Sequence, residues 1–303
     1  GDWSSDVCSS DLLKSLDSGI TTKNYADANQ LLESIKGYQI KYASDIIPSD
    51  EKIHAEIMYN KYDIFRNLFM YYFLAGLLFF IFIIFNIFSE NKSIHNFMKY
   101  IFIIFRSSIV LLFIAHTLGL IARWYISGHA PWGDAYESMI YVAWATMGIG
   151  LLFIKKSDLT LASTSFVTSM ILMIAHWNWM DPSIANLVPV FNSYWLMIHV
   201  SVIVGSYGPF ALSMILGFVS LLLIVFITRT NKEKIKNQLS ELTMINELSV
   251  TVGLIMLTIG NFLGGMWANE SWGRYWGWDP KETWALISIL VYAFILQIGR
   301  AHV

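Results

Sequence analysis

Long apolar runs alternate with short polar connections through most of the chain. Seven of these runs come close to the ~20 residues that a helix needs to cross a bilayer. Gly205, Gly208 and Pro209 interrupt the fifth run, where we expect a kink or the close approach of a ligand. The pattern predicts an all-α polytopic membrane protein with about seven transmembrane helices. The expected spans are 67–88, 100–122, 138–154, 159–177, 195–227, 246–265 and 283–297.

The chain before the first apolar run is polar by comparison. Apolar residues recur at roughly helical spacing between Leu16 and Ile35, which predicts one helix there. A second helix is expected after Pro48, with Ser49 as its N-cap. We therefore expect residues 13–65 to form a short soluble segment of two helices on the outer face. A transmembrane domain is expected over 66–297.

The two ends of the chain resemble translated sequencing-library adapter. We expect residues 1–12 and 298–303 to be non-native, and we leave them out of the fold argument. If the end of the chain is translated adapter, the adapter DNA supplies the second and third bases of the codon of Gln297, and only the first base is native. His codons begin with the same base, so the pattern leaves open whether the native residue at that position is a His.

Composition and charge support the membrane assignment. Hydrophobic residues make up 55% of the chain and charged residues 14%, and the net charge is −2. No basic patch typical of nucleic-acid binding is visible in the sequence. The single cysteine, Cys8, lies in the segment expected to be non-native. We therefore expect no disulfide, no Cys-ligated metal and no thiol nucleophile in the native part.

Lys and Arg are distributed unequally between the two sets of connections, which predicts the orientation in the cytoplasmic (inner) membrane. The Trp-rich stretch described next is thereby placed on the outer, periplasmic face. The set expected in the cytoplasm holds Lys92, Lys99, Lys155, Lys156, Arg229, Lys232, Lys234 and Lys236, and the other set holds Arg123, Arg274 and Lys281.

Residues 261–284, here called the Trp segment, are expected to form a loop between the last two spans. Glycines interleave with the rings and permit tight turns. An aromatic belt at the membrane interface is one interpretation. The density of indoles favours the other, a flat apolar platform for a large planar ligand. Asp279 is expected to cap the last helix, with Glu282 in its first turn. The tryptophans are Trp267, Trp272, Trp276, Trp278 and Trp284.

Histidines lie near the predicted outer ends of several spans, and neutral imidazole is the usual protein ligand of haem iron. His199 opens the fifth span, and we favour an iron ligand there over a capping or interface role. His129, in a Gly-Pro turn, and His176 are more typical of structural positions. His116 lies inside the second span, where a functional residue and a neutral histidine bonded to a neighbouring helix are equally compatible with the pattern.

Residues 272–284 resemble the WWD signature of haem-handling membrane proteins, in the version found in CcsA-type cytochrome c biogenesis proteins. The order of Trp, Gly, Asp, Pro, Lys and Glu is kept over more than a dozen residues. The resemblance continues through 193–200 and 123–129 and covers nearly all of 66–296. Ile47-Pro48-Ser49 and Tyr59-Asn60-Lys61 are similar to the junction in fused CcsB–CcsA proteins.

The resemblance implies a holocytochrome c synthase (haem lyase) that binds haem b at an outer-face site and promotes its attachment to Cys-x-x-Cys-His of apocytochrome c. A CcsB-like half is the implied partner. By position, His199 corresponds to an axial histidine of the iron, and a second is expected beyond the end of the chain. The alternative is a haem exporter or chaperone without ligase activity; a solute transporter finds no support. The implied haem-binding residues are Trp267, Trp272, Trp276, Trp278, Asp279, Trp284, His199 and His129.

Overall fold

The regular secondary structure of the protein is α-helical in every range described. A computed structural model describes residues 5–43, 47–88, 92–177, 180–184, 193–228 and 231–301. Within these ranges the all-α prediction is confirmed. The chain divides into two compact units, Gly1–Ala55 and Glu56–Val303, and the division falls within the third helix.

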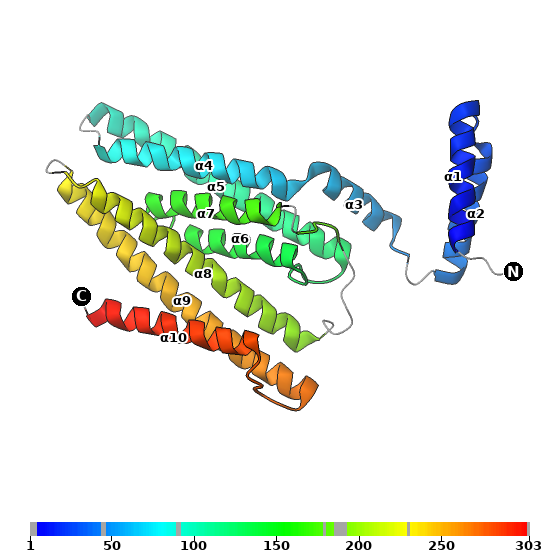
Figure 1. Ribbon diagram of the computed structural model, residues 1–303. Helices are drawn as coiled ribbons and strands as arrows, with labels where there is room; N and C mark the ends of the chain where they lie inside the picture. The colour runs from blue at the N-terminus through cyan, green and yellow to red at the C-terminus, as the bar shows by residue number, and fades with distance from the viewer. Residues whose placement is uncertain are drawn as a thin grey trace. The chain divides into compact units, whose positions relative to one another are not determined.

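The first unit contains two helices that pack side by side, α1 (Ser5–Thr22) and α2 (Ala26–Ala43) (Figure 1). The sequence predicted one helix across this region. The helix is divided because Lys23 adopts a left-handed conformation (φ 58°) and the Asn24 side chain accepts a hydrogen bond from the Ala26 N–H. An Asn side chain that bonds the backbone two residues further on favours a turn, so a new helix begins at Ala26 instead of the old one continuing.

A third helix leads into the transmembrane domain. Helix α3 (Asp50–Tyr62) begins after Ser49, whose hydroxyl accepts a hydrogen bond from the Lys52 N–H, so the predicted cap is confirmed. Asp63, at φ 39°, separates α3 from α4 (Ile64–Phe88). The predicted second helix therefore ends directly where the first membrane span begins.

All seven predicted spans fall on the helices α4 to α10. Among the described residues, six helical stretches are long and apolar enough to cross a membrane, and α6 is the predicted span that is not one of them. Helix α6 carries Glu137 and packs against α5, α7 and α8, which suits a helix enclosed by others. The remaining helices are α5 (Lys92–Ser127), α6 (Ala135–Leu152), α7 (Asp158–Ala175), α8 (Tyr194–Val225), α9 (Lys232–Trp272) and α10 (Pro280–Ala301).

Gly208 of α8 serves helix packing. Helix α8 runs as one element from Tyr194 to Val225, with Pro209 inside it. A β-carbon at Gly208 would lie 2.8 Å from the Thr146 backbone nitrogen of α6. A close approach at Gly208 is therefore made by a neighbouring helix.

Helix α10 is the least enclosed helix of the bundle. It packs against α9, and its Tyr292 stacks on Phe210 of α8 with ring centroids 3.8 Å apart. No residue of its apolar stretch is buried. By contrast, two thirds of the apolar stretch of α7 is buried, 67%.

The bundle has two distinct ends (Figure 1). Helices α5, α7 and α9 finish at one end, where α6, α8 and α10 begin. This end carries the Trp segment and is called the Trp end below. The opposite end carries the α4–α5, α6–α7 and α8–α9 connections and is called the far end.

Candidate functional site

The Trp segment is mostly helical, which differs from the loop that the sequence predicted. Helix α9 continues to Trp272, so Trp267 and Trp272 stand on its last turns, and Trp284 stands on α10. Gly273 ends α9 in a left-handed conformation (φ 69°), and its N–H donates to the Asn269 carbonyl. Glycine fits this position because it adopts positive φ without a steric penalty. Only residues 273–279 form a connection between helices.

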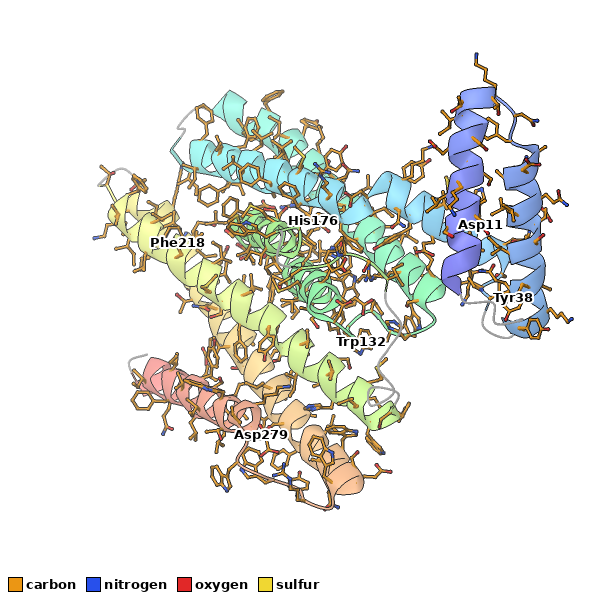
Figure 2. The ribbon with its side chains drawn as sticks, turned by 45° about the vertical axis from the view of Figure 1, so that its right-hand side comes forward. Asp11, Tyr38, Trp132, His176, Phe218 and Asp279 are labelled. Carbon is orange, nitrogen blue, oxygen red and sulfur yellow. The ribbon has the colours of Figure 1, made fainter. Side chains whose placement is uncertain are left out.

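Asp279 and Glu282 cap α10 reciprocally, as the sequence predicted. The Asp279 carboxylate accepts a hydrogen bond from the Glu282 N–H at 2.9 Å. The Glu282 carboxylate accepts one from the Gly277 N–H at 2.8 Å and another from the Asp279 N–H at 3.4 Å. The Asp279 cap and Glu282 in the first turn also place negative charge at the positive end of the helix dipole. Figure 2 marks Asp279 at this turn into α10.

The connection folds back onto the end of α9. The Tyr275 hydroxyl donates to the Phe262 carbonyl at 3.1 Å, and the Tyr275 ring covers Gly265 so closely that a β-carbon there would lie 2.6 Å from it. The Arg274 guanidinium lies 5.8 Å from the centre of the Trp272 ring and fills the space beside Gly277. These contacts fix the connection, and they place one cation among the indoles.

The indoles of the Trp segment form two edge-to-face pairs. Trp267 and Trp272 are 4.8 Å apart at 69°, and Trp276 and Trp278 are 5.7 Å apart at 86°. The rings therefore do not make the single flat surface that was expected. Trp278 and Trp284 are 70% and 67% exposed, and the buried Trp276 Nε1 has no hydrogen-bond acceptor among the described residues. Aromatic surface is thus available at this end.

His199 lies against α9 directly below the Trp segment. Its Nδ1 is 2.7 Å from the Gly260 carbonyl oxygen, and because that oxygen only accepts hydrogen bonds, Nδ1 carries the proton. In the neutral ring, Nε2 then holds the lone pair. The ring passes over Gly264, where a β-carbon would collide with it. Trp267 follows Gly264 by three residues and so lies on the same side of α9. Half-buried His199 and the base of the Trp segment are therefore neighbours.

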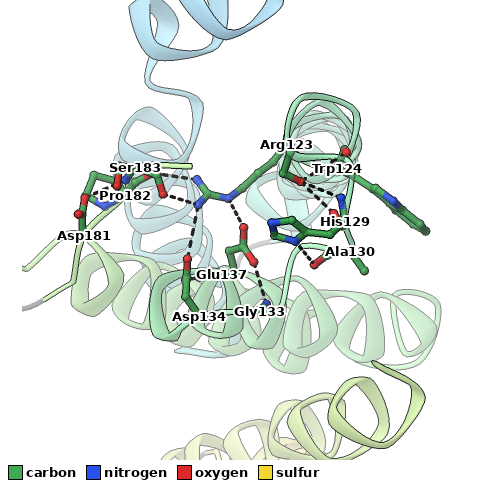
Figure 3. A network of polar contacts seen from close by, with 11 residues as sticks. Arg123, Trp124, His129, Ala130, Gly133, Asp134, Glu137, Asp181, Pro182 and Ser183 are labelled. Carbon is green, nitrogen blue, oxygen red and sulfur yellow. Dashed lines mark hydrogen bonds and ion pairs between the residues drawn. The ribbon is translucent and has the colours of Figure 1, made fainter. Parts of the chain in front are cut away.

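His129 is held by its own turn. Its Nδ1 is 3.1 Å from the Ala130 carbonyl oxygen. The Ser127 hydroxyl donates to the His129 carbonyl at 2.9 Å, and the same hydroxyl accepts from the His129 N–H at 3.3 Å. These bonds hold the His129 backbone in the turn between α5 and α6 (Figure 3), and its Nδ1, like that of His199, lies against a backbone carbonyl.

Two further histidines, His176 and His116, are held by backbone carbonyls. His176 Nδ1 lies 3.2 Å from the Leu172 carbonyl oxygen, and its Nε2 lies 3.5 Å from the Asp63 carboxylate. Both nitrogens thus face acceptors, which leaves none for a metal. His116 is fully buried, and its Nε2 lies 3.1 Å from the Ile140 carbonyl oxygen of α6. For His116 the structure supports the histidine bonded to a neighbouring helix.

A buried charged cluster beside His129 was not predicted. Arg123 was assigned to a loop, but it lies in α5 with no exposed surface. Its Nε donates to the Glu137 carboxylate at 2.8 Å, and its two terminal nitrogens donate to the carbonyls of Pro182 and Ser183 at 2.9 and 3.0 Å. The remaining Glu137 oxygen accepts from the Gly133 N–H. One guanidinium therefore joins α5, α6 and residues 180–184 (Figure 3).

Two carboxylates border this cluster. Asp134 caps α6 by accepting from the Glu137 N–H at 2.7 Å and lies 3.8 Å from the Arg123 guanidinium. Burial raises the pKa of the Asp134 carboxyl, and the hydrogen bond from the Glu137 N–H and the Arg123 charge offset the rise only in part. The Ser183 N–H, which donates to Asp181, lowers the pKa of the Asp181 carboxyl. The only sequence signal of the cluster was an Arg in an apolar run followed by acids at the next helix start.

Among the described residues, no three or more His, Cys, Asp or Glu side chains converge as a site for a bare metal ion. Haem iron has a smaller requirement, because the porphyrin supplies four nitrogens and the protein supplies one or two axial ligands. His199, with a backbone-held Nδ1–H and a basic Nε2, has the hydrogen-bonding pattern that metal-ligating histidines use. Exposed indoles and the Arg274 cation lie one to three helical turns away along α9 and its connection.

Sequence comparison shows that this chain is related to known proteins. A sequence profile described as Cytochrome C assembly protein matches residues 132–302, more than half of the chain. Protein NrfI of Wolinella succinogenes is 43% identical over 277 residues, which cover 91% of this chain and 30% of NrfI. The chain thus spans less than a third of that relative.

Shorter relatives match a larger share of their own length. The cytochrome c biogenesis protein CcsA of Prochlorococcus marinus subsp. pastoris is 33% identical over 263 residues, covering 74% of this chain and 79% of CcsA. The CcsA protein of Chlamydomonas reinhardtii is 37% identical over 187 residues, covering 59% of this chain and 52% of that protein.

Proposed function

Because the chain belongs to the cytochrome c assembly protein family, we propose that it binds haem b beside the Trp segment and positions it for attachment to apocytochrome c. The proposed axial ligand is His199 Nε2. The observation that carries this assignment is the 2.7 Å hydrogen bond from His199 Nδ1 to the Gly260 carbonyl. That bond fixes the ring orientation and leaves the basic nitrogen available to iron.

The residues around His199 have separate positioning roles in this proposal. Gly264 admits the imidazole against α9, and Gly260 holds it in one tautomer. Trp267, Trp272, Trp276, Trp278 and Trp284 offer apolar ring surface, and Arg274 offers a cation for a haem propionate. The Asp279–Glu282 cap acts indirectly, because it fixes the connection that carries these side chains.

When bound, haem b supplies two vinyl groups, and each takes up one cysteine S–H to form a thioether. The sulfur bonds to one vinyl carbon and the hydrogen adds to the other, so the step needs no net oxidant or reductant. The contribution of this chain is orientation, since fixing the ring and the client thiols converts a bimolecular step into an effectively unimolecular one. The proposed client is a protein segment with the sequence Cys-x-x-Cys-His.

The protein is an integral membrane protein, and we propose that the Trp end lies on the periplasmic side of the inner membrane. The excess of Lys and Arg at the far end supports this orientation. Burial of Arg123 strengthens the bias, because that residue does not contribute a loop charge at the Trp end. A CcsB-like half, in the same chain or as a partner, completes the proposed assembly.

An absorption spectrum of the full protein that contains this chain tests the haem site. Purified from membranes, it is expected to carry haem with low-spin bands, and His199→Ala is expected to weaken or shift those bands. Added imidazole should restore them in the variant, because a free imidazole fills the place of the deleted ring. His54→Ala, an exposed histidine on α3, is the control. A colourless protein, or bands indifferent to His199→Ala, would remove this ligand.

Attachment needs a separate assay. Co-expression with an apocytochrome bearing Cys-x-x-Cys-His is expected to give haem that stays on the client through a denaturing gel. Haem bound by the protein but never linked to the client would favour the exporter alternative. The two assays therefore distinguish haem binding from ligation.

A further inference from the structure

A cavity lies at the far end of the bundle, remote from the Trp segment. Its volume is about 510 Å³, within the range of small-molecule sites. Four elements form its walls: the end of α4, the first turns of α5, the α6–α7 connection and the first turns of α9. None of the residues assigned to the haem site lines it.

The floor of the cavity is apolar and continues onto the outer surface of the bundle. Ile83, Ile87 and Met98 line it and are at most 8% exposed. Phe102 and Ile103 follow on α5, and Ile103 is 56% exposed. In a membrane-spanning helix such a side chain faces acyl chains. The apolar wall therefore leads from the cavity to the lipid.

The rim of the cavity is charged, with an excess of cations. Arg106 uses Nε and Nη2 to bind both oxygens of Asp158, at 2.6 and 2.8 Å, so this pair is neutral and fixed. Its Nη1 remains as a donor nitrogen. Lys99 and Lys156 also line the rim, against one further acid, Glu241. The lining thus carries three cations and two anions, one of which is already paired.

We propose that this cavity binds the phosphate headgroup of an anionic phospholipid. Lys99, Lys156 and Arg106 Nη1 would hold the phosphate, and an acyl chain would lie along Phe102 and Ile103. An anionic headgroup matches the excess of positive charge, and a basic pocket between membrane helices is a recognised site for such lipids. A water-soluble phosphate has the same charge, but it leaves the apolar wall without a partner.

Charge-matched variants test the site. The full protein is purified in mild detergent from membranes that contain phosphatidylglycerol and phosphatidylethanolamine, and native mass spectrometry counts retained lipid. Lys99→Gln/Lys156→Gln is expected to retain roughly tenfold less phosphatidylglycerol than wild type, since each lysine near the surface contributes to anionic-lipid binding. Lys155→Gln/Lys232→Gln removes the same charge from the same end without touching the cavity lining, and is expected to retain lipid as wild type does.

Equal loss of phosphatidylglycerol in both double variants would overturn the proposal, because the effect would then come from general surface charge. A second arm separates the two sources of phosphate. Glycerol 3-phosphate at millimolar concentration is expected to leave the retained lipid in place. If it displaces the lipid from wild type, the cavity is a site for soluble phosphate and the lipid assignment is wrong.

Discussion

The Arg123 cluster and the Trp segment occupy the same end of the bundle but are built in opposite ways. Arg123 and Glu137 are at most 1% exposed, and the guanidinium has three hydrogen-bonded partners. At the Trp segment three of the five tryptophans are exposed: Trp272, Trp284 and Trp278, the last at 70%. The Arg123 cluster satisfies its polar groups with partners inside the bundle. The Trp segment exposes apolar surface that a ligand, a partner protein or lipid can cover.

At the Trp end, substitutions that lower stability and substitutions that impair binding should therefore fall on different residues. A buried charge strongly requires its partner, so substitutions in the Arg123 cluster should act on folding. Exposed rings contribute little to folding, so substitutions there should act on what the rings bind. His199 stands between the two, because it is half-buried and both packs on α9 and presents a nitrogen.

The largest expected effect is at the buried ion pair. Glu137→Gln removes the hydrogen-bonded counter-ion of Arg123 and leaves the more distant, partly exposed Asp134 at 3.8 Å, and we expect a loss of about 3–5 kcal/mol of stability. The measurement is the unfolding temperature in a fixed detergent, compared with wild type. Arg123→Leu/Glu137→Leu removes both charges and should recover part of the loss. If the double variant is no more stable than Glu137→Gln, the penalty does not come from an unpaired charge.

A smaller loss of stability is expected at Gly264, which packs against the half-buried His199 ring at the base of the Trp segment. Gly264→Ala places a methyl group against the His199 ring, and overpacking of this kind costs about 1–3 kcal/mol. The same variant should alter the haem bands as His199→Ala does, because the ring must move. Unfolding temperature and absorption spectrum measure the two effects.

Gly217→Ala on α8 is the matched control for Gly264→Ala. A β-carbon at Gly217 meets nothing within 4 Å, so the helix should gain about 0.5–1 kcal/mol from the alanine.

A combined Gly264→Ala/His199→Ala variant should be more stable than the sum of the two single changes predicts, because the alanine at position 199 removes the ring that the new methyl group meets. Strict additivity would show that the ring does not lie over Gly264.

The helix cap under the connection should give a local effect. Asp279→Ala removes the acceptor of the Glu282 N–H, which typically costs about 1 kcal/mol. Because α10 is little enclosed, we expect faster amide hydrogen exchange in residues 280–284 with a nearly unchanged unfolding temperature. Lys281→Ala, in the same turn without a cap bond, is the control. Equal exchange in both variants would argue against the cap.

The apolar runs predicted the helices well, because spanning a bilayer requires about 20 apolar residues in a row and leaves few alternatives. Helix ends were harder. The run at 246–265 indicated one span, but α9 extends from Lys232 to Trp272, since its polar outer turns also favour helix. For this reason Trp267 and Trp272 stand on a helix although a loop was expected.

The site was predictable only where chemistry is local in sequence. The Asp279–Glu282 cap follows from a spacing of three residues, and it is confirmed. The Arg123–Glu137 pair could not be inferred in this way, because its members lie on different helices across a turn. The His199 tautomer depends on Gly260, 61 residues away, and no sequence pattern encodes that contact.

The smallest change in stability is expected at Trp278, and it bears most directly on what the exposed rings do. Trp278→Ala should change stability by no more than about 0.5 kcal/mol, because the ring is exposed and forms an edge-to-face pair with Trp276. Haem retention and client attachment should nevertheless fall.

Trp144→Ala supplies the contrast to Trp278→Ala. Trp144 donates to the Thr117 hydroxyl and stacks between Phe113 and Tyr141, so its loss should lower the unfolding temperature clearly. Normalised to folded protein, haem retention in that variant should stay near wild type. If Trp278→Ala instead leaves haem and attachment unchanged, its ring is an interfacial anchor, and the membrane is then what the exposed side of the Trp segment contacts.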